Sequence, residues 1–384
     1  MNKHNYRQHD SPQMLESPTN ISPIAQPPQT LEFQQPKVSR WTGIDLFRVI
    51  AVFGVIILHA DEGLSQLPPS WPSVLNFFSF AVPFFLATSF WLSAKKLTQS
   101  GNRFRLSSRF TRLLIPYLSW TIVYLGYKVF KYSLVGELAN VKQIFQNTLG
   151  VILTGDAAFH LYFLPLLLAG TLIIYPLADS WSKESKTWQL SYLIGWQILS
   201  LLGYQIYRDF TTNILVFADS IWLKEVATFV GYFVRCLPYI VSAMILNHSQ
   251  VANYWRRPNA IKILTVATIF LLANLVDYGI VPHSLHELIR GVSALLLAIL
   301  ISGYLEGNRW LVSLSKCSFG IFLVHLLFVE VFQIAENRLL ANSFRVSTPN
   351  LLAFSVLVFL LSWLVVDRML RHRLLAKLLF GVGR

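Results

Sequence analysis

Long apolar runs separated by short polar segments fill the chain from residue 40 onwards. A helix that crosses a membrane needs roughly 20 mostly apolar residues, and the pattern predicts ten such helices. They lie at residues 44–60, 74–94, 113–133, 159–178, 189–207, 226–246, 261–281, 287–305, 310–334 and 350–370. The fifth run fits the pattern least well. Residues 141–158 form either an amphipathic helix at the membrane interface or a plain loop.

The first 39 residues have a different pattern. They are rich in Gln, Pro, Ser and Asn and show little apolar periodicity, which is typical of a disordered tail. They lack the basic start, short apolar core and small-residue cleavage site of a signal peptide. We therefore expect a disordered tail at 1–39, one transmembrane domain at 40–374 and a short tail at 375–384.

Composition supports an all-α polytopic membrane protein that forms one helical bundle. The 384 residues are 54% hydrophobic and 13% charged, whereas a soluble domain carries about 25% charged residues. The net charge of +13 does not require a nucleic-acid partner, because basic cytoplasmic loops give membrane proteins a positive charge. Cys236 and Cys317 lie in apolar runs and offer neither a disulfide framework nor metal-ligand spacing.

The distribution of Lys and Arg predicts the orientation of the bundle. The segment after the second run holds Lys95, Lys96, Arg103, Arg105, Arg109 and Arg112, whereas the segment after the first run holds Asp61 and Glu62 and no basic residue. Basic residues are retained on the cytoplasmic side. With ten spans, the basic segments and both termini lie on the same side of the membrane, which we call one face of the bundle. We expect that face to be cytoplasmic and the protein to lie in the cytoplasmic membrane.

The first apolar run carries ionisable residues along one side. Arg48 and His59 are eleven positions apart, which places them at nearly the same azimuth and roughly 16 Å apart along a helix. Asp45 lies three positions before Arg48, close enough to pair with it. Glu62 can reach His59 if the helix continues for one more turn. An alternative is that Asp45 and Arg48 extend to the interface and His59 is an ordinary interfacial histidine.

The stretch IDLFRVIAVFGVIILH, residues 44–59, resembles the opening helix of the acyltransferase-3 family, whose multi-spanning members add acyl groups to surface polysaccharides. In that helix an Asp is followed, after two other residues, by an Arg. Ten mostly apolar residues then separate the Arg from a His. Asp45, Arg48 and His59 occupy the three polar places.

Four later segments resemble further motifs of the family, in the same order. They are AVPFFLATSFWL (81–92), RFTRLLIPY (109–117), HLYFLPLLL (160–168) and CSFGIFLVH (317–325). In the first of them Ser89 stands where the family has glycine. The resemblance spans about residues 40 to 370.

The resemblance implies transfer of an acyl group, most simply acetyl, from acyl-CoA to a hydroxyl of a surface glycan or its lipid-linked precursor. Neutral histidine is well suited to remove the hydroxyl proton, so His59 is the candidate base, although an acyl-histidine intermediate is an alternative. Arg48 would stabilise oxyanion charge or hold an anionic part of the donor, and Asp45 would orient it. No cofactor beyond the acyl-CoA substrate is expected.

Other motif residues allow two interpretations. Arg105, Arg109 and Arg112 share a helical face. They form either a phosphate-binding patch for acyl-CoA or a set of topology signals, that is, basic residues that only keep this segment on the cytoplasmic side. His160 and His325 are either packing residues or part of the substrate site, together with Ser89 and Glu62. The roles of a last group stay open, and its members could pair inside the bundle: Arg235, Asp277, Arg290, Glu330 and Asp367.

A transporter of polysaccharide or of a proton-coupled solute is the rival function, because intramembrane charges and histidines also serve proton relays. The sequence shows neither repeated halves nor a matching pair of interrupted helices. A non-catalytic scaffold would leave the charged stripe at 45–59 without a reason.

Overall fold

The computed structural model describes residues 40–64, 66–100, 106–136, 141–142, 147–183, 190–213, 220–276, 279, 281–306, 308–339 and 347–382. Within these ranges the chain is helical and contains no strand, as predicted for an all-α membrane protein. Residues 40–384 form one compact unit. The predicted tail at 1–39 lies outside the described residues.

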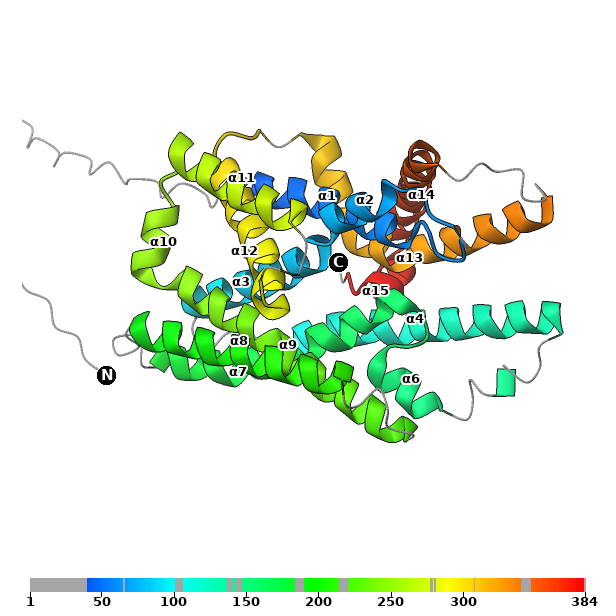
Figure 1. Cartoon of the computed structure of the whole chain (residues 1–384), viewed down its shortest axis with the longest axis horizontal. Coiled ribbons are helices and arrows are strands. Elements are labelled where there is room, and N and C mark those ends of the chain that lie inside the picture. Colours follow the sequence, from blue (N-terminus) through cyan, green and yellow to red (C-terminus); the bar gives the residue numbers. More distant parts are fainter. Residues whose placement is uncertain are drawn as a thin grey trace, which may run out of the picture. The chain divides into compact units, whose positions relative to one another are not determined.

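The helices follow one another from the first apolar run to the C-terminal segment (Figure 1). They are α1 (Thr42–His59), α2 (Trp71–Phe78), α3 (Ala81–Ser100), α4 (Leu106–Val135), α6 (Thr148–Thr154), the 3-10 turn η2 (Phe159–Tyr162), α7 (Phe163–Lys183), α8 (Leu190–Asn213), α9 (Ile221–Asn247), α10 (Ser249–Trp255), α11 (Ala260–Leu275), α12 (His283–Ile301), α13 (Arg309–Leu339), α14 (Thr348–Leu370) and α15 (Arg373–Phe380).

Eight helices of the described chain are long and apolar enough to cross a membrane, and α10 with α11 adds a ninth if that bent pair is counted as one span. The predicted run at 261–281 is α11, which meets α10 at an angle of 101°. The predicted run at 189–207 is α8, which is not among the eight and whose apolar stretch is interrupted by Gln197 and Gln205. The expected count of ten is thus approximate.

Helix α1 lies inside the bundle and contacts α3, α12, α13 and α14. Its side chains at Ala51, Val52 and Ile56 have no exposed surface. Close packing against α12 depends on Gly43, because a Cβ there would lie 2.0 Å from the carbonyl oxygen of Ala298. Small residues at helix crossings allow such approach in membrane proteins.

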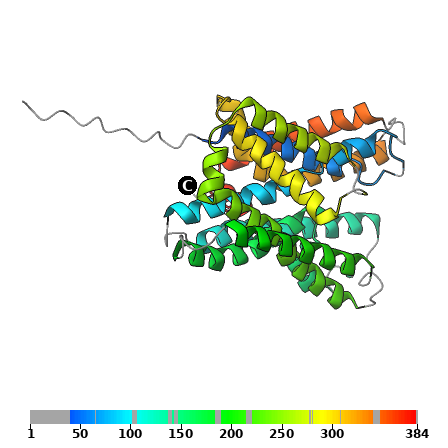
Figure 2. The ribbon, with the colours of Figure 1, turned by 60° about the vertical axis from the view of Figure 1, so that its left-hand side comes forward.

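Helices α7, α8 and α9 run side by side along one edge of the bundle (Figures 1 and 2). Residues 141–158, expected as an interfacial helix or a loop, contain the short helix α6 and the turn that leads into η2. Gly155 ends α6 with a φ of 84°, a left-handed conformation that favours glycine. This turn directs η2 back into the bundle, where α13 contacts it.

Candidate active site

His59 ends α1 and lies against a carboxylate from the following turn. Its Nδ1 contacts Oε1 of Glu62, as the spacing of the two residues suggests, and Gln333 donates to the backbone carbonyl of Glu62. An ionised carboxylate only accepts hydrogen bonds, so Nδ1 carries the proton. The lone pair of the neutral imidazole is therefore on Nε2, which is the nitrogen that can act as a base.

Two histidines from distant parts of the chain lie beside His59. The ring centroid of His325 is 5.5 Å from that of His59, and the ring centroid of His160 is 6.3 Å from it. The His160 and His325 centroids are 5.0 Å apart. His160 comes from η2 and His325 from α13. We call these three residues the histidine cluster and its end of the bundle the histidine end.

The three imidazoles differ in exposure. The side chain of His59 is 19% exposed, whereas His160 is 2% exposed and His325 is fully buried. His59 is therefore the member of the cluster that a molecule from outside the bundle can reach first.

The two buried imidazoles have unused hydrogen-bonding capacity. Nδ1 of His325 lies 2.7 Å from the carbonyl oxygen of Phe322, which makes it the donor and leaves Nε2 as an acceptor. That Nε2 and both ring nitrogens of His160 have no hydrogen-bond partner among the described residues. Buried polar atoms without partners are uncommon, and here they gather next to the exposed imidazole. A bound ligand could supply the missing partners.

Aromatic side chains enclose the buried part of the cluster. The ring of Tyr124 lies 5.2 Å from that of His160, and the ring of Phe322 lies 5.3 Å from it. The Tyr124 hydroxyl donates to the carbonyl of Leu323 at 2.8 Å, which ties α4 to α13 beside the site. Sequence reasoning missed Tyr124, because a tyrosine in an apolar helix resembles any packing residue.

The three histidines do not make a recognisable metal centre. Within the described ranges, no group of three or more His, Cys, Asp or Glu side chains could hold a metal ion. The arrangement instead offers one accessible base beside buried, neutral imidazoles.

At the other end of α1, the predicted ion pair between Asp45 and Arg48 is wrong, since no ion pair joins these two described residues. The Asp45 carboxylate instead contacts Arg40 and accepts a hydrogen bond from Ser315 Oγ at 2.5 Å. Arg40 precedes the helix, so its side chain can fold back over the first turn, and Ser315 approaches from α13. Arg48 is half-buried on α1.

The predicted arginine patch divides between two environments. Arg109 is half-buried, and its Nη2 donates to Ser89 Oγ at 2.9 Å, which links α4 to α3. Arg112 is exposed. Arg105 lies outside the described residues.

Arg112 lines a surface pocket together with Lys377 of α15. The other lining residues include three with hydroxyl groups, Ser107, Ser108 and Thr111. We call this the Arg112 pocket and its end of the bundle the basic end. Two cations and several hydroxyls are a suitable set of groups for binding phosphate.

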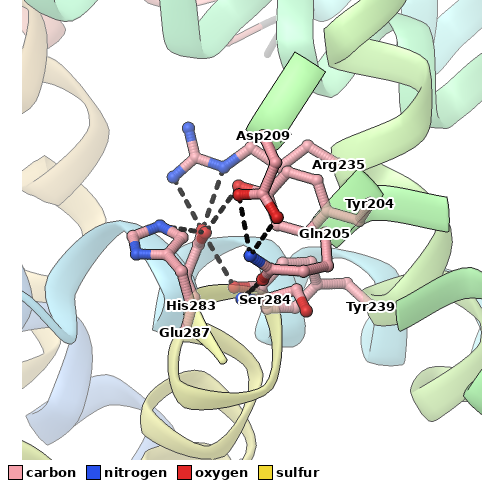
Figure 3. A network of polar contacts seen from close by, with 8 residues as sticks. All are labelled: Tyr204, Gln205, Asp209, Arg235, Tyr239, His283, Ser284 and Glu287. Carbon is pink, nitrogen blue, oxygen red and sulfur yellow. Dashed lines mark hydrogen bonds and ion pairs between the residues drawn. The ribbon is translucent and has the colours of Figure 1, made fainter. Parts of the chain in front are cut away.

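A second polar network lies between α8, α9 and α12 (Figure 3). Glu287 Oε1 accepts hydrogen bonds from Arg235 Nε at 2.9 Å and Arg235 Nη2 at 2.7 Å. The hydroxyl of Tyr204 donates to Oε2 at 2.8 Å, and that of Tyr239 donates to Oε1 at 3.1 Å. The buried carboxylate of Glu287 is thus fully compensated.

Four of the residues whose roles were left open have partners outside that group. Arg235 pairs with Glu287, and Arg290 binds the Asn76 side chain and the Ala273 carbonyl. Glu330 pairs with Lys131 and Asp367 with Arg371. Asp277 lies outside the described residues. The sequence could not assign these pairs because it does not show which helices are neighbours.

Comparison with known proteins identifies the family of the chain. The acyltransferase-3 family model, described as an acyltransferase domain, matches residues 41–367. A serine/alanine racemase from Enterococcus gallinarum is 29% identical over 163 residues, which are 40% of this chain and 22% of that protein. The chain therefore spans about a fifth of that relative's length. The comparison with solved structures found no match. Since the family model covers most of the chain, the protein is a membrane acyltransferase that belongs to the acyltransferase-3 family.

Proposed function

We propose that this protein transfers an acyl group, most simply acetyl, from acyl-CoA to a hydroxyl of a surface glycan or of its lipid-linked precursor. The observation that carries the proposal is the arrangement at His59. This imidazole is the accessible member of the histidine cluster, and Glu62 contacts its Nδ1, which leaves the lone pair on Nε2 to act as the base.

The chemistry follows from that tautomer. The acceptor hydroxyl gives its proton to His59 Nε2 while its oxygen attacks the thioester carbonyl carbon. The carbon–sulfur bond then breaks, and the sulfur of CoA takes the proton from His59. The Glu62 carboxylate stabilises the transient imidazolium, because it keeps its hydrogen bond to Nδ1 throughout. The products are the acyl ester and CoA.

The buried imidazoles position the acceptor. His325 Nε2 is an acceptor without a partner among the described residues, so a second hydroxyl of a sugar can donate to it. His160 lies between the rings of His325 and Tyr124 and shapes the wall of this subsite. A polyhydroxylated acceptor matches these groups better than a thiol or an amine does.

The donor would enter from the basic end, which we assign to the cytoplasm. The Arg112 pocket offers cations and hydroxyls for the phosphates of CoA. His59 and Arg48 are roughly 16 Å apart along α1, a distance that the extended pantetheine arm can cover inside the bundle. Arg48 is too far from His59 to touch the same reacting atoms, so its role is to bind or position the donor rather than to stabilise the oxyanion.

The test uses the full-length protein, purified and reconstituted into vesicles with [¹⁴C]acetyl-CoA. We expect time-dependent release of CoA that requires an added glycan acceptor, and we expect His59→Ala to abolish it. Label that remains on acetyl-CoA in both proteins, together with solute flux into the vesicles, would refute the enzyme and support a transporter instead.

A further inference from the structure

A basic groove runs between α8 and α9, near the C-terminus of the first helix and the N-terminus of the second. Its lining includes Arg208 from α8 and Lys224 and Arg235 from α9, and none of its described lining residues carries a carboxylate. The nearby Asp209 is not part of this lining and accepts two hydrogen bonds from Gln205. We call this the α8–α9 groove. Two cations that no described carboxylate pairs with, together with a third whose charge Glu287 balances, favour an anionic ligand.

Arg235 is held rigidly at the base of the groove. Both of its hydrogen bonds to Glu287 use the same carboxylate oxygen, and Tyr204 and Tyr239 hold that carboxylate in place (Figure 3). A guanidinium has five N–H donors, so those not used for Glu287 remain for a ligand. The ion pair therefore fixes the orientation of Arg235 before any ligand binds.

Arg208 and Lys224 differ from Arg235 in that no described carboxylate holds them in place. Neither side chain forms an ion pair within the part of the chain that the structure describes, and Lys224 is exposed while Arg208 is half-buried. A topology signal would place such cations at the basic end. These two lie instead at the opposite ends of their helices, in the half of the bundle that contains the histidine cluster. Their position calls for a different explanation.

The surroundings of the α8–α9 groove are apolar. Exposed Ile206 and Phe210 flank it on α8, and exposed Trp222 and Val226 flank it on α9. In a membrane protein such side chains face lipid. The groove is therefore open to the bilayer near its surface, where the polar head of an amphiphile lies.

The groove is joined to the candidate active site through η2. The Tyr232 hydroxyl donates to the carbonyl of Thr154 at 2.5 Å, and the Tyr162 ring lies 6.4 Å from the Tyr232 ring. The Arg235 guanidinium lies 6.0 Å from the centre of the Tyr162 ring. Tyr162 belongs to the same 3-10 turn as His160. One side of this turn thus faces the groove, and the other side contributes to the histidine cluster.

We propose that the α8–α9 groove binds the phosphate or pyrophosphate of a lipid-linked acceptor whose lipid chain lies against the apolar faces of α8 and α9. Arg208 and Lys224 neutralise the phosphate charge, the unused N–H donors of Arg235 hydrogen-bond to the phosphate, and the attached sugar extends past Tyr162 towards His59. This inference rests on the proposed function for the identity of the acceptor. It assigns the groove, rather than the histidine cluster, as the site that distinguishes a lipid-linked acceptor from a free glycan.

The test is equilibrium binding of tritiated farnesyl pyrophosphate to the full-length protein in phosphatidylcholine nanodiscs. We expect saturable binding that farnesol does not displace. Arg208→Gln and Lys224→Gln should each weaken it by about tenfold or more, the usual effect of losing a charged hydrogen bond, and Lys224→Arg should retain it. Lys142→Gln removes an exposed cation elsewhere and should bind normally.

Equal affinity in wild-type protein, Arg208→Gln and Lys224→Gln would overturn the groove as the site. If phosphatidylglycerol displaces the tritiated ligand as effectively as unlabelled farnesyl pyrophosphate does, the groove binds an ordinary phospholipid. The proposal of a lipid-linked acceptor would then be wrong. Displacement by inorganic pyrophosphate to the same degree would indicate a site for free phosphate and also overturn the proposal. Because no acyl donor is present, this binding can fail while acyl transfer persists, and it can persist while acyl transfer fails.

Discussion

His59 differs from the other two histidines of the cluster in what its ring nitrogens contact. Its Nδ1 is held by Glu62, while Nδ1 of His325 is held by a backbone carbonyl. A carboxylate stabilises the protonated imidazolium by opposite charge, whereas a carbonyl does so only through its dipole. Of the two, His59 is therefore the better suited to carry a proton during turnover, and it is also the more accessible.

His59→Ala should lower kcat for acyl transfer by about 10²–10⁴, the usual contribution of a general base. The variant should still bind acetyl-CoA, because the residues proposed to bind the donor lie at the basic end of the bundle. Turnover is measured by CoA release under saturating donor and acceptor. Wild-type turnover in a correctly folded His59→Ala protein would show that His59 is an interfacial histidine without a chemical role.

Arg112→Gln should raise the KM for acetyl-CoA by about tenfold and leave kcat nearly unchanged, because a phosphate contact contributes to binding in the ground state and the transition state alike. Arg112→Lys should recover part of the loss, since a point charge cannot make the paired contacts of a guanidinium. Arg257→Gln is the matched control, because Arg257 is an exposed arginine outside the Arg112 pocket. Identical donor kinetics in Arg112→Gln and Arg257→Gln would reduce Arg112 to a topology signal.

At the residue scale, the sequence named individual candidates but could not supply most of their partners. The spacing of His59 and Glu62 indicated their contact because both belong to one helix and its next turn. The partner of Asp45 was predicted incorrectly because Arg40 and Ser315 compete for the carboxylate from outside the helix. The convergence of three histidines depends on the contacts of α1, η2 and α13, which no local spacing encodes.

Among the elements, η2 depends on an exacting turn. The turn before it requires Gly155 in a left-handed conformation, and a Cβ at this position would lie 2.7 Å from both the nitrogen and the Cα of Tyr162. Backbone cannot move aside as a flexible side chain can. The position of His160 and of Tyr162 therefore depends on this single glycine.

Gly155→Ala should displace η2 and reduce both thermal stability and kcat. Gly136→Ala provides the matched control, because Gly136 has a similar φ of 82° but a Cβ added there would meet no described atom within 4 Å. Both substitutions carry the left-handed penalty of about 1–2 kcal/mol, and only Gly155→Ala adds the backbone clash. The two proteins are compared by melting temperature and by CoA release. Equal values for both variants would show that the turn before η2 tolerates a side chain.

Apolar periodicity located the helices well because membrane burial requires long apolar runs. It could not show that α2 and α3 are separate helices, or that α10 and α11 meet at 101°, since bends in the chain depend on neighbouring helices. α8 was the least certain run for a physical reason. Part of its polar character serves the Glu287 network and the α8–α9 groove rather than contact with lipid.

For the whole molecule, the two ends of the bundle have different chemical characters. The basic end contains the Arg112 pocket, and the histidine end contains the histidine cluster and opens beside the α8–α9 groove. An enzyme that takes a donor from one side of a membrane and an acceptor from the other needs such a division. The proposed reaction therefore makes a prediction about orientation that can be tested without any substrate.

Single cysteines at Gln66 and Arg257 test the orientation, because both residues are exposed and lie at opposite ends of the bundle. The native Cys236 and Cys317 are buried and should contribute little background labelling. In intact cells, an impermeant maleimide should label Gln66→Cys and should label Arg257→Cys only after the membrane is permeabilised. The physical reason is that basic segments remain on the cytoplasmic side during insertion. The reverse pattern would place the Arg112 pocket outside, away from cytoplasmic acyl-CoA, and the proposed path of the donor along α1 would then be wrong.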